Sequence, residues 1–155
     1  MAKVRFLGNQ GYTMAEMALT LVVAGIVTTA GVVTLGPAVE HAKVRSAANA
    51  VAGDLQYAQA IAVRERRPIS VLVEPDSMRI VIRDRDQTSN IHRVRSLGAD
   101  TDFSLDHLSA TSPSLEMFPN GLAGSTVSIT LGLRGFLRQV KVTRAGQIRI
   151  IRTPL

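Results

Sequence analysis

An α+β fold is what the sequence predicts: one long N-terminal helix, hydrophobic at first and amphipathic later, packed on a C-terminal antiparallel β-sheet head. Three observations lead to this prediction. Residues 12–39 are apolar and contain a single charged side chain. Residues 40–67 repeat apolar side chains every three or four positions, which is the period of a helix. In residues 68–155 apolar and polar side chains tend to alternate, which is the period of a strand.

The first element is a short basic leader, residues 1–11, whose only charged side chains are Lys3 and Arg5. An uncharged run from Met17 to Val39 follows it closely. About 20 apolar helical residues are enough to cross a bilayer, and flanking cations stay on the cytoplasmic side. The sequence therefore predicts a single-pass protein with a cytoplasmic N-terminus, a transmembrane helix at 12–39, and an extracytoplasmic head.

Glu16 distinguishes among three interpretations of this N-terminal segment. A secretory signal peptide would be cut near the small residues Thr29 and Ala30, and a plain membrane anchor would not be cut at all. Neither has a use for a carboxylate inside an apolar span, which costs about 2–4 kcal/mol unless it is paired. A filament subunit does have a use for it, because the freed N-terminal amine of a neighbouring subunit can pair with the carboxylate.

The segment Gly11-Tyr12-Thr13-Met14-Ala15-Glu16 resembles the signature of type IV prepilins. The resemblance implies that a prepilin peptidase cuts between Gly11 and Tyr12, that the new N-terminus of Tyr12 is methylated, and that Glu16 acts in filament assembly. The family usually has Phe where this chain has Tyr12. The implied partners are other pilin or pseudopilin subunits, the prepilin peptidase/methyltransferase and the inner-membrane assembly platform. The implied location is the bacterial inner membrane, with the head periplasmic in a diderm, and then the filament.

Helix-breaking residues interrupt the apolar run at Gly25, Gly31, Gly36 and Pro37. Glycine weakens a helix and proline removes a backbone donor. Two interpretations stay open. These residues are tolerated breaks within a membrane helix, or they allow the helix to bend or partly melt when it leaves the membrane and packs in a filament.

Residues 40–67 continue the helix in amphipathic form. Small and aliphatic side chains form a narrow stripe, made of Val44, Ala47, Ala48, Val51, Leu55, Ala58 and Ala62. Such a stripe lets a sheet approach the helix closely. Arg64, Arg66 and Arg67 near its end favour the negative pole of the helix dipole, and Pro68 stops the helix.

The head contains several predicted strands. They are 69–74 and 78–83 as a hairpin, 114–118 before the turn at 119–121, and 126–133, 136–143 and 147–152 separated by turns at 134–135 and 144–146. Residues 84–112 are predicted to be rich in loops, with weaker strand signals at 91–97 and 103–108. We expect one antiparallel sheet or two small ones.

Three stretches of the chain resemble the GspH/FimT branch of the pseudopilins: residues 54–64 at the helix end, 118–121, and 146–150. This resemblance implies a minor pilin or pseudopilin at or near the tip of a filament. It leaves open whether the filament belongs to a type II secretion system or to a type IV pilus.

The last strands are strongly basic. Residues 134–155 contain no acid and six cations, which are Arg134, Arg138, Lys141, Arg144, Arg149 and Arg152. Such a surface can contact phosphates without sequence specificity. FimT-like members are associated with DNA uptake through a basic C-terminal region, which Arg144, Arg149 and Arg152 resemble. The alternatives are protection of an exposed sheet edge and pairing with Asp100, Asp102 or Asp106. Phe136 is the only aromatic residue nearby, which disfavours base stacking.

The sequence carries no enzyme signature, and we predict no enzymatic activity, no cofactor and no metal. The chain has no cysteine, which excludes disulfides and thiolate sites. The histidines His41, His92 and His107 lack metal-ligand spacing. The acidic loop at 100–106 lacks the central glycine and terminal glutamate of a calcium loop. The net charge of +6 is compatible with anionic partners such as lipid headgroups or nucleic acid.

Overall fold

The computed structural model describes residues 12–152, apart from the side chains of 30–35. The predicted leader and its cleavage residue Gly11 lie outside the described residues. The chain divides into two compact units, Met1–Pro37 and Ala38–Leu155, and each is described by itself.

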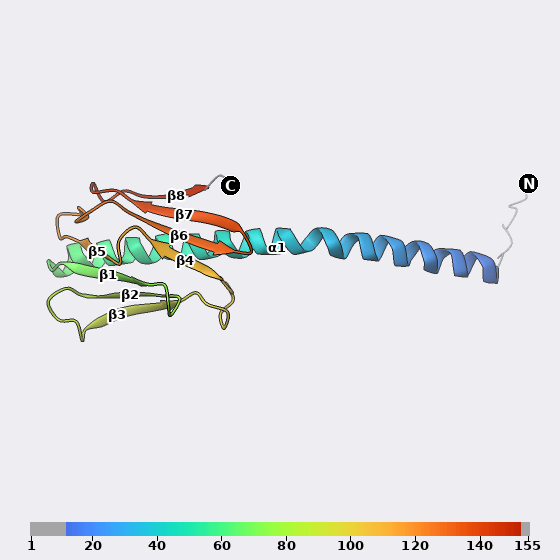
Figure 1. Cartoon of the computed structure of the whole chain (residues 1–155), viewed down its shortest axis with the longest axis horizontal. Helices are drawn as coiled ribbons and strands as arrows, with labels where there is room; N and C mark the ends of the chain where they lie inside the picture. The colour runs from blue at the N-terminus through green and yellow to red at the C-terminus, as the bar shows by residue number, and fades with distance from the viewer. Residues whose placement is uncertain (1–11, 153–155) are drawn as a thin grey trace, which may run out of the picture. The chain divides into compact units, whose positions relative to one another are not determined.

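A single helix, α1, extends from Met14 to Glu65 and contains Pro37 (Figure 1). The helix was predicted over residues 12–67, and the observed one is two residues shorter at each end. Its start is set by Thr13, which caps the first turn. Its end is set by Arg66, which has a positive φ of 53°, and by Pro68, which disfavours helix in the preceding residue.

In the first unit, every described side chain from residue 12 to residue 29 is exposed to solvent in the isolated chain. Thr20, Thr28 and Thr29 turn their hydroxyl groups back onto helix carbonyls, so they leave few free polar groups on this surface. Among the residues that the structure describes, no helix has a stretch long and apolar enough to span a bilayer.

The second unit contains two four-stranded antiparallel sheets (Figure 1). The first has the order β3-β2-β1-β5, with β1 Ile69–Glu74, β2 Arg79–Asp84, β3 Ile91–Ser96 and β5 Ser114–Met117. The second has the order β4-β6-β7-β8, with β4 His107–Ala110, β6 Val127–Leu133, β7 Phe136–Val142 and β8 Ile148–Arg152. The predicted α+β fold is confirmed, with two small sheets rather than one.

One hydrophobic core joins the helix to both sheets. The predicted stripe is buried at all seven positions, from Val44 to Ala62, and none of its residues is more than 1% exposed. Alternate residues of the strands complete the core, as in β1 and β6, where apolar side chains point inward. Alanine at four of the seven stripe positions brings the helix backbone close to the strands.

Most predicted strands agree with the structure to within one or two residues. The strand predicted at 103–108 is displaced in the structure: Ser104 has a positive φ of 50°, and β4 begins only at His107. The turn at 134–135 is confirmed: Arg134 and Gly135 have φ values of 49° and 88°. Positive φ at both central residues is typical of a two-residue hairpin whose twist matches its strands.

Candidate functional sites

The first candidate site is the start of α1, where Thr13 and Glu16 cap each other. The Glu16 carboxylate accepts hydrogen bonds at Oε2 from the Thr13 backbone N–H at 2.9 Å and from the Thr13 hydroxyl at 3.0 Å. The Glu16 N–H donates in return to Thr13 Oγ1 at 3.3 Å. This is a capping box, which satisfies donors that a helix start otherwise leaves free. The spacing Thr-x-x-Glu was readable in the sequence and was missed, because Glu16 was interpreted by its charge alone.

The capping box leaves half of the Glu16 carboxylate free for a partner. Both described hydrogen bonds use Oε2, and Oε1 accepts none from a described residue. Around it the helix surface is apolar on every side, with Tyr12, Met14, Met17, Leu19, Leu21, Val22, Val23, Ile26 and Val27 all exposed. A helix that is apolar all round requires burial in protein or lipid.

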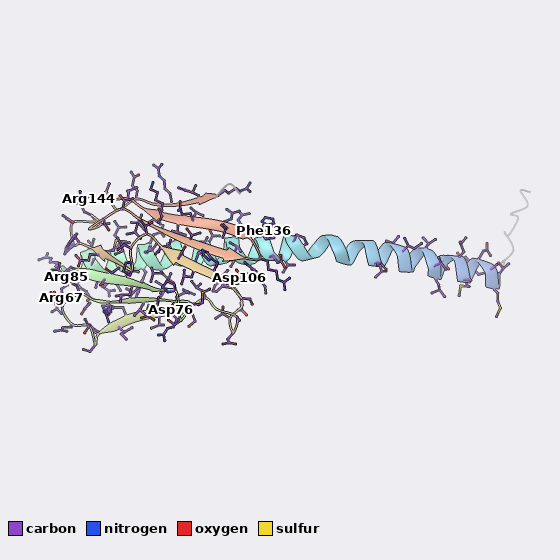
Figure 2. All side chains as sticks on the ribbon, in the orientation of Figure 1. Arg67, Asp76, Arg85, Asp106, Phe136 and Arg144 are labelled. Atoms are coloured by element: carbon purple, nitrogen blue, oxygen red, sulfur yellow. The ribbon has the colours of Figure 1, made fainter. Side chains whose placement is uncertain are left out.

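The second candidate site is the set of six basic residues near the C-terminus, which the structure divides among three places. Arg134 lies in the β6–β7 turn and Arg144 in the β7–β8 turn. Figure 2 labels Phe136, the first residue of β7, and Arg144 at opposite ends of that strand. The other four residues lie within β7 and β8.

Arg134 is held by two acids of its own chain. Its guanidinium pairs with Glu40 at 2.6 Å, and its backbone N–H donates to Asp106 at 2.7 Å. Asp106 thus meets only the backbone of Arg134, and among the described residues none of the six basic side chains forms an ion pair with Asp100, Asp102 or Asp106. Arg134 serves the hairpin turn and the helix, so it is the least suited of the six to bind an outside partner.

The four strand residues form two like-charged pairs across the sheet. Arg138 is the direct partner of Arg152, and Lys141 is the direct partner of Arg149. Like charges directly opposite each other destabilise a sheet. Neither these four residues nor Arg144 forms an ion pair with any described residue.

The two pairs lie on opposite faces of the second sheet. Val140 and Val142 point into the core, so Lys141 between them points outward, together with Arg149. Arg149 donates to the side chain of Gln147 at 3.2 Å, two residues earlier on the same face. Arg138 and Arg152 instead line a hollow of about 240 Å³, together with His41 and Phe136, whose ring centroids are 3.8 Å apart. The six residues therefore do not form one continuous surface.

Sequence reasoning missed a third arrangement, the buried carboxylate of Asp54 in α1. Asp54 is 2% exposed and accepts hydrogen bonds from Arg93 at 2.7 Å and from Arg95 at 2.5 and 2.8 Å. Arg93 also lies 4.2 Å above the ring of Tyr57. Burial alone would raise the pKa of Asp54, but the hydrogen bonds and charges of Arg95 and Arg93 outweigh it and lower that pKa. The signal was the polar residue Asp54 next to the stripe residue Leu55.

A fourth arrangement lies where α1 ends. Glu65, Asp84 and His92 come from α1, β2 and β3, and the ligand atoms that they offer lie within 4.8 Å of one another. His92 Nε2 is 2.7 Å from Asp84 Oδ1, and the Asn90 amide donates to Asp84 Oδ2 at 2.7 Å. These hydrogen bonds lower the pKa of Asp84. The spacing of the histidines along the chain gave no sign of this group, because the fold brings His92 to two carboxylates from other elements.

Comparison with known structures shows a shared fold. The type IV minor pilin FimU of Pseudomonas aeruginosa strain PAO1 matches in two crystal forms, with 21% and 22% identity and TM-scores of 0.55 and 0.57. These matches cover 69% and 74% of this chain and 91% of FimU. The minor pseudopilin EpsH from the type 2 secretion system of Vibrio cholerae matches with 13% identity and a TM-score of 0.58, over 71% of this chain and 97% of EpsH.

No protein in a search of curated sequences matches the chain. The family model of the type II transport protein GspH matches residues 47–146, which extend from the second turn of the buried stripe to the β7–β8 turn. This segment is about two thirds of the 155 residues and contains the Asp54 arrangement, the first sheet and all of the second sheet except β8. The chain belongs to the GspH family of type II transport proteins.

Proposed function

We propose that this chain is a minor pilin or pseudopilin that lies at or near the tip of a type II secretion pseudopilus or a type IV pilus. Members of the GspH family are structural subunits, not enzymes. The observation that carries the proposal is the contrast within α1. From Val44 on, the helix buries its stripe in a complete head, whereas residues 12–29 expose apolar side chains on every side. Such a surface needs neighbouring subunits or lipid to cover it.

The sequence motif at 11–16 supports the proposed maturation. Cleavage between Gly11 and Tyr12 by a prepilin peptidase, followed by methylation of the Tyr12 amine, would give the mature subunit. The inner membrane, with a cytoplasmic N-terminus and an extracytoplasmic head, is the proposed location before assembly. Other pilin or pseudopilin subunits and the inner-membrane assembly platform are the proposed partners.

The maturation step is tested by coexpression with a prepilin peptidase and measurement of the intact mass. We expect the mass to fall by that of residues 1–11 and to rise by one methyl group. Gly11→Val should abolish the loss, while Gly8→Val in the same leader should leave it unchanged. An unprocessed wild-type chain, or a Gly11→Val chain processed at the same site, contradicts the proposal.

The role of Glu16 is tested by two substitutions that separate its charge from its capping function. Glutamine at the third helical position also forms a capping box, so Glu16→Gln keeps the cap and removes the charge. Thr13→Val removes the capping hydroxyl and keeps the charge of Glu16. If assembly depends on pairing with the amine of a neighbour, Glu16→Gln should be processed but should fail to enter filaments. Normal incorporation of Glu16→Gln would show that the carboxylate serves only the cap.

Placement at the tip is tested by labelling the chain in isolated filaments. A tip subunit should appear at one filament end, at about one copy per filament. Labels distributed along the filament length would contradict the tip placement and leave the role as a subunit intact.

A second candidate function, DNA binding for uptake, is favoured by the pair Lys141 and Arg149. These cations face each other on the outer side of the sheet and pair with no described acid. A phosphate between them would relieve the repulsion. The full chain in detergent should shift DNA in a gel, and Lys141→Ala with Arg149→Ala should reduce the slope of log K against log salt by about one per lost phosphate contact.

The matched control for the DNA experiment is Arg79→Ala, because Arg79 is exposed but already pairs with Glu74 at 2.8 Å. It removes one positive charge from the head without touching the like-charged pair. Because the double variant removes two charges, a loss in Arg79→Ala half as large as in the double variant would reduce the effect to net charge. Absence of salt-sensitive binding in the wild-type chain would reject this second function.

A further inference from the structure

The second unit contains two buried carboxylates among its described residues, and only one of them is neutralised by arginine. Asp54 and Asp84 are 2% and 3% exposed. Asp54 forms ion pairs with Arg93 and Arg95, whereas the one ion-pairing partner of Asp84 within the described chain is the ring of His92. Burying a carboxylate is costly unless a cation or several donors compensate it. Asp84 is thus a buried anion that lacks a permanently charged neighbour at contact distance.

Two further ligand atoms accompany Asp84. Glu65 is the last residue of α1 and His92 is the second residue of β3, and together with Asp84 they form a group whose ligand atoms lie within 4.8 Å of one another. We propose that Glu65, Asp84 and His92 form a divalent transition-metal site that binds Zn²⁺ and joins the end of the helix to the β2–β3 hairpin.

The donor set favours Zn²⁺ over Ca²⁺ or Mg²⁺. One imidazole nitrogen and two carboxylate oxygens are ligands that Zn²⁺ binds at about 2.0–2.2 Å, whereas Ca²⁺ and Mg²⁺ prefer oxygen ligands throughout. Ligands at this bond length around a tetrahedral ion lie about 3.4 Å apart. The present separations therefore need only a small side-chain adjustment, in which the ion replaces the hydrogen bond between His92 and Asp84.

The surroundings give the ion access and hold its central ligand. Asp84 lines a hollow of about 210 Å³ together with Arg67, Pro68, Asp86 and Gln87, which leaves room for water as a fourth ligand. The amide of Asn90 donates to the other oxygen of Asp84 at 2.7 Å and keeps the carboxylate in place, as partners of metal ligands commonly do.

Nearby cations oppose binding, and two of them, Arg64 and Arg85, are already paired with acids. Arg64 contacts Glu65 at 3.2 Å on the protein surface, a contact that a metal ion would displace. Arg85 pairs with Asp86 and Glu116 at 3.8 and 3.5 Å. Arg67 lines the hollow, and Figure 2 labels it beside Arg85 at this end of the head.

The test is a titration of the untagged full chain in detergent, freed of metal with a chelator, with Zn²⁺ as the probe. We expect one Zn²⁺ per chain by calorimetry and a higher midpoint of thermal unfolding in its presence. His92→Gln and Glu65→Gln should each weaken binding at least tenfold. His92→Gln retains a donor toward Asp84, so it should fold. His107→Gln is the matched control, because His107 is exposed and its ring has one hydrogen-bond partner among the described residues, the Ser109 hydroxyl at 3.2 Å.

Three outcomes would overturn the proposal. The first is absence of saturable Zn²⁺ binding in the wild-type chain. The second is unchanged affinity in His92→Gln, which would place the bound ion elsewhere. The third is Ca²⁺ binding as tight as that of Zn²⁺ and indifferent to His92→Gln, which would indicate a site made of carboxylates alone. The experiment does not depend on filament assembly, so its failure leaves the proposed function untouched.

Discussion

The two outer strands β3 and β8 both carry arginines, but they use them in opposite ways. In β3, Arg93 and Arg95 share the face that packs toward α1, and both reach the buried carboxylate of Asp54. In β8, Arg149 and Arg152 lie directly opposite other cations of β7. Each strand forms the edge of its sheet. The same residue type at equivalent places therefore closes the core in one sheet and repels its neighbours in the other.

This difference shows that the role of an arginine follows from the partner that it contacts, and not from how many arginines a strand carries. The arginines of β3 contribute to the fold, since a buried carboxylate is compensated only while they stay in place. The cations of β7 and β8 contribute nothing comparable and even oppose pairing of their strands. Selection for folding alone would favour their loss, so they are the better candidates for an external anion.

The largest effect is expected for Asp54→Ala, which tests whether the arginines of β3 stabilise the fold. It leaves two arginines without their acid and opens space beneath β3, and removing one member of a buried ion pair costs about 3–5 kcal/mol. We expect thermal unfolding of the chain at a clearly lower temperature. Lys141→Ala serves as the control and should not lower it. If Asp54→Ala lowers the free energy of unfolding by less than about 1 kcal/mol, the ion pairs of Asp54 contribute no more than a surface ion pair does.

The second prediction concerns the stability of the chain at low pH. Because the pKa of Asp54 is lowered in the folded chain, its contribution to stability is present above the unfolded pKa of about 3.9 and is lost as the pH falls through the folded value. Asp54→Asn lacks this titration. The gap in unfolding temperature between wild type and Asp54→Asn should be constant from pH 7 to pH 5 and shrink below about pH 4. A gap that stays constant down to pH 2 contradicts the shift.

Local periodicity was enough to predict most of the fold. The stripe from Val44 to Ala62 was found by its helical spacing, and the hairpins by alternation and by Pro or Gly in their turns. The strand order was not predictable, because pairing of β1 with β5 joins segments about 45 residues apart along the chain. The displaced β4 shows the same limit: a positive φ at Ser104 moves the strand start and has no clear sequence signal.

The candidate sites were predicted only where the signal is local. The motif around Glu16 lies within six residues and resembles the prepilin signature; its role in assembly stays a prediction, and its capping role was missed. The basic residues were recognised as a set, but cross-strand register decides that Lys141 faces Arg149 and that Arg134 meets Glu40. Asp54 with Arg95, and Asp84 with His92, depend on tertiary contacts. Such pairs join residues from different elements of the chain, so they leave no local pattern in the sequence.

The third prediction tests whether β8 is positioned by close packing of its turn rather than by charge. Gly146 has a φ of +76°, and a Cβ there would lie 2.1 Å from the carbonyl oxygen of Gly121, which also accepts from Gln59 at 2.8 Å. Gly146→Ala should therefore cost more than the roughly 1–2 kcal/mol of a left-handed alanine alone. Gly135→Ala is the control, because Gly135 has a φ of +88° and open space around it. Equal losses of stability would contradict close packing at Gly146.

The smallest expected effect comes from Lys141→Glu, and it separates folding from binding. The substitution turns a like-charged pair with Arg149 into an opposite pair, which should stabilise the chain by about 0.2–1 kcal/mol. Gln139→Glu is the control: it adds a negative charge on the same face, but its direct partner is Ile151. If the outer face of β7 and β8 binds phosphate, Lys141→Glu should raise the unfolding temperature and weaken DNA binding together. A rise in stability with unchanged DNA binding would leave the pair without a role in contacting DNA. A fall in stability would show that the two cations do not repel each other, and the contrast between β3 and β8 would then be lost.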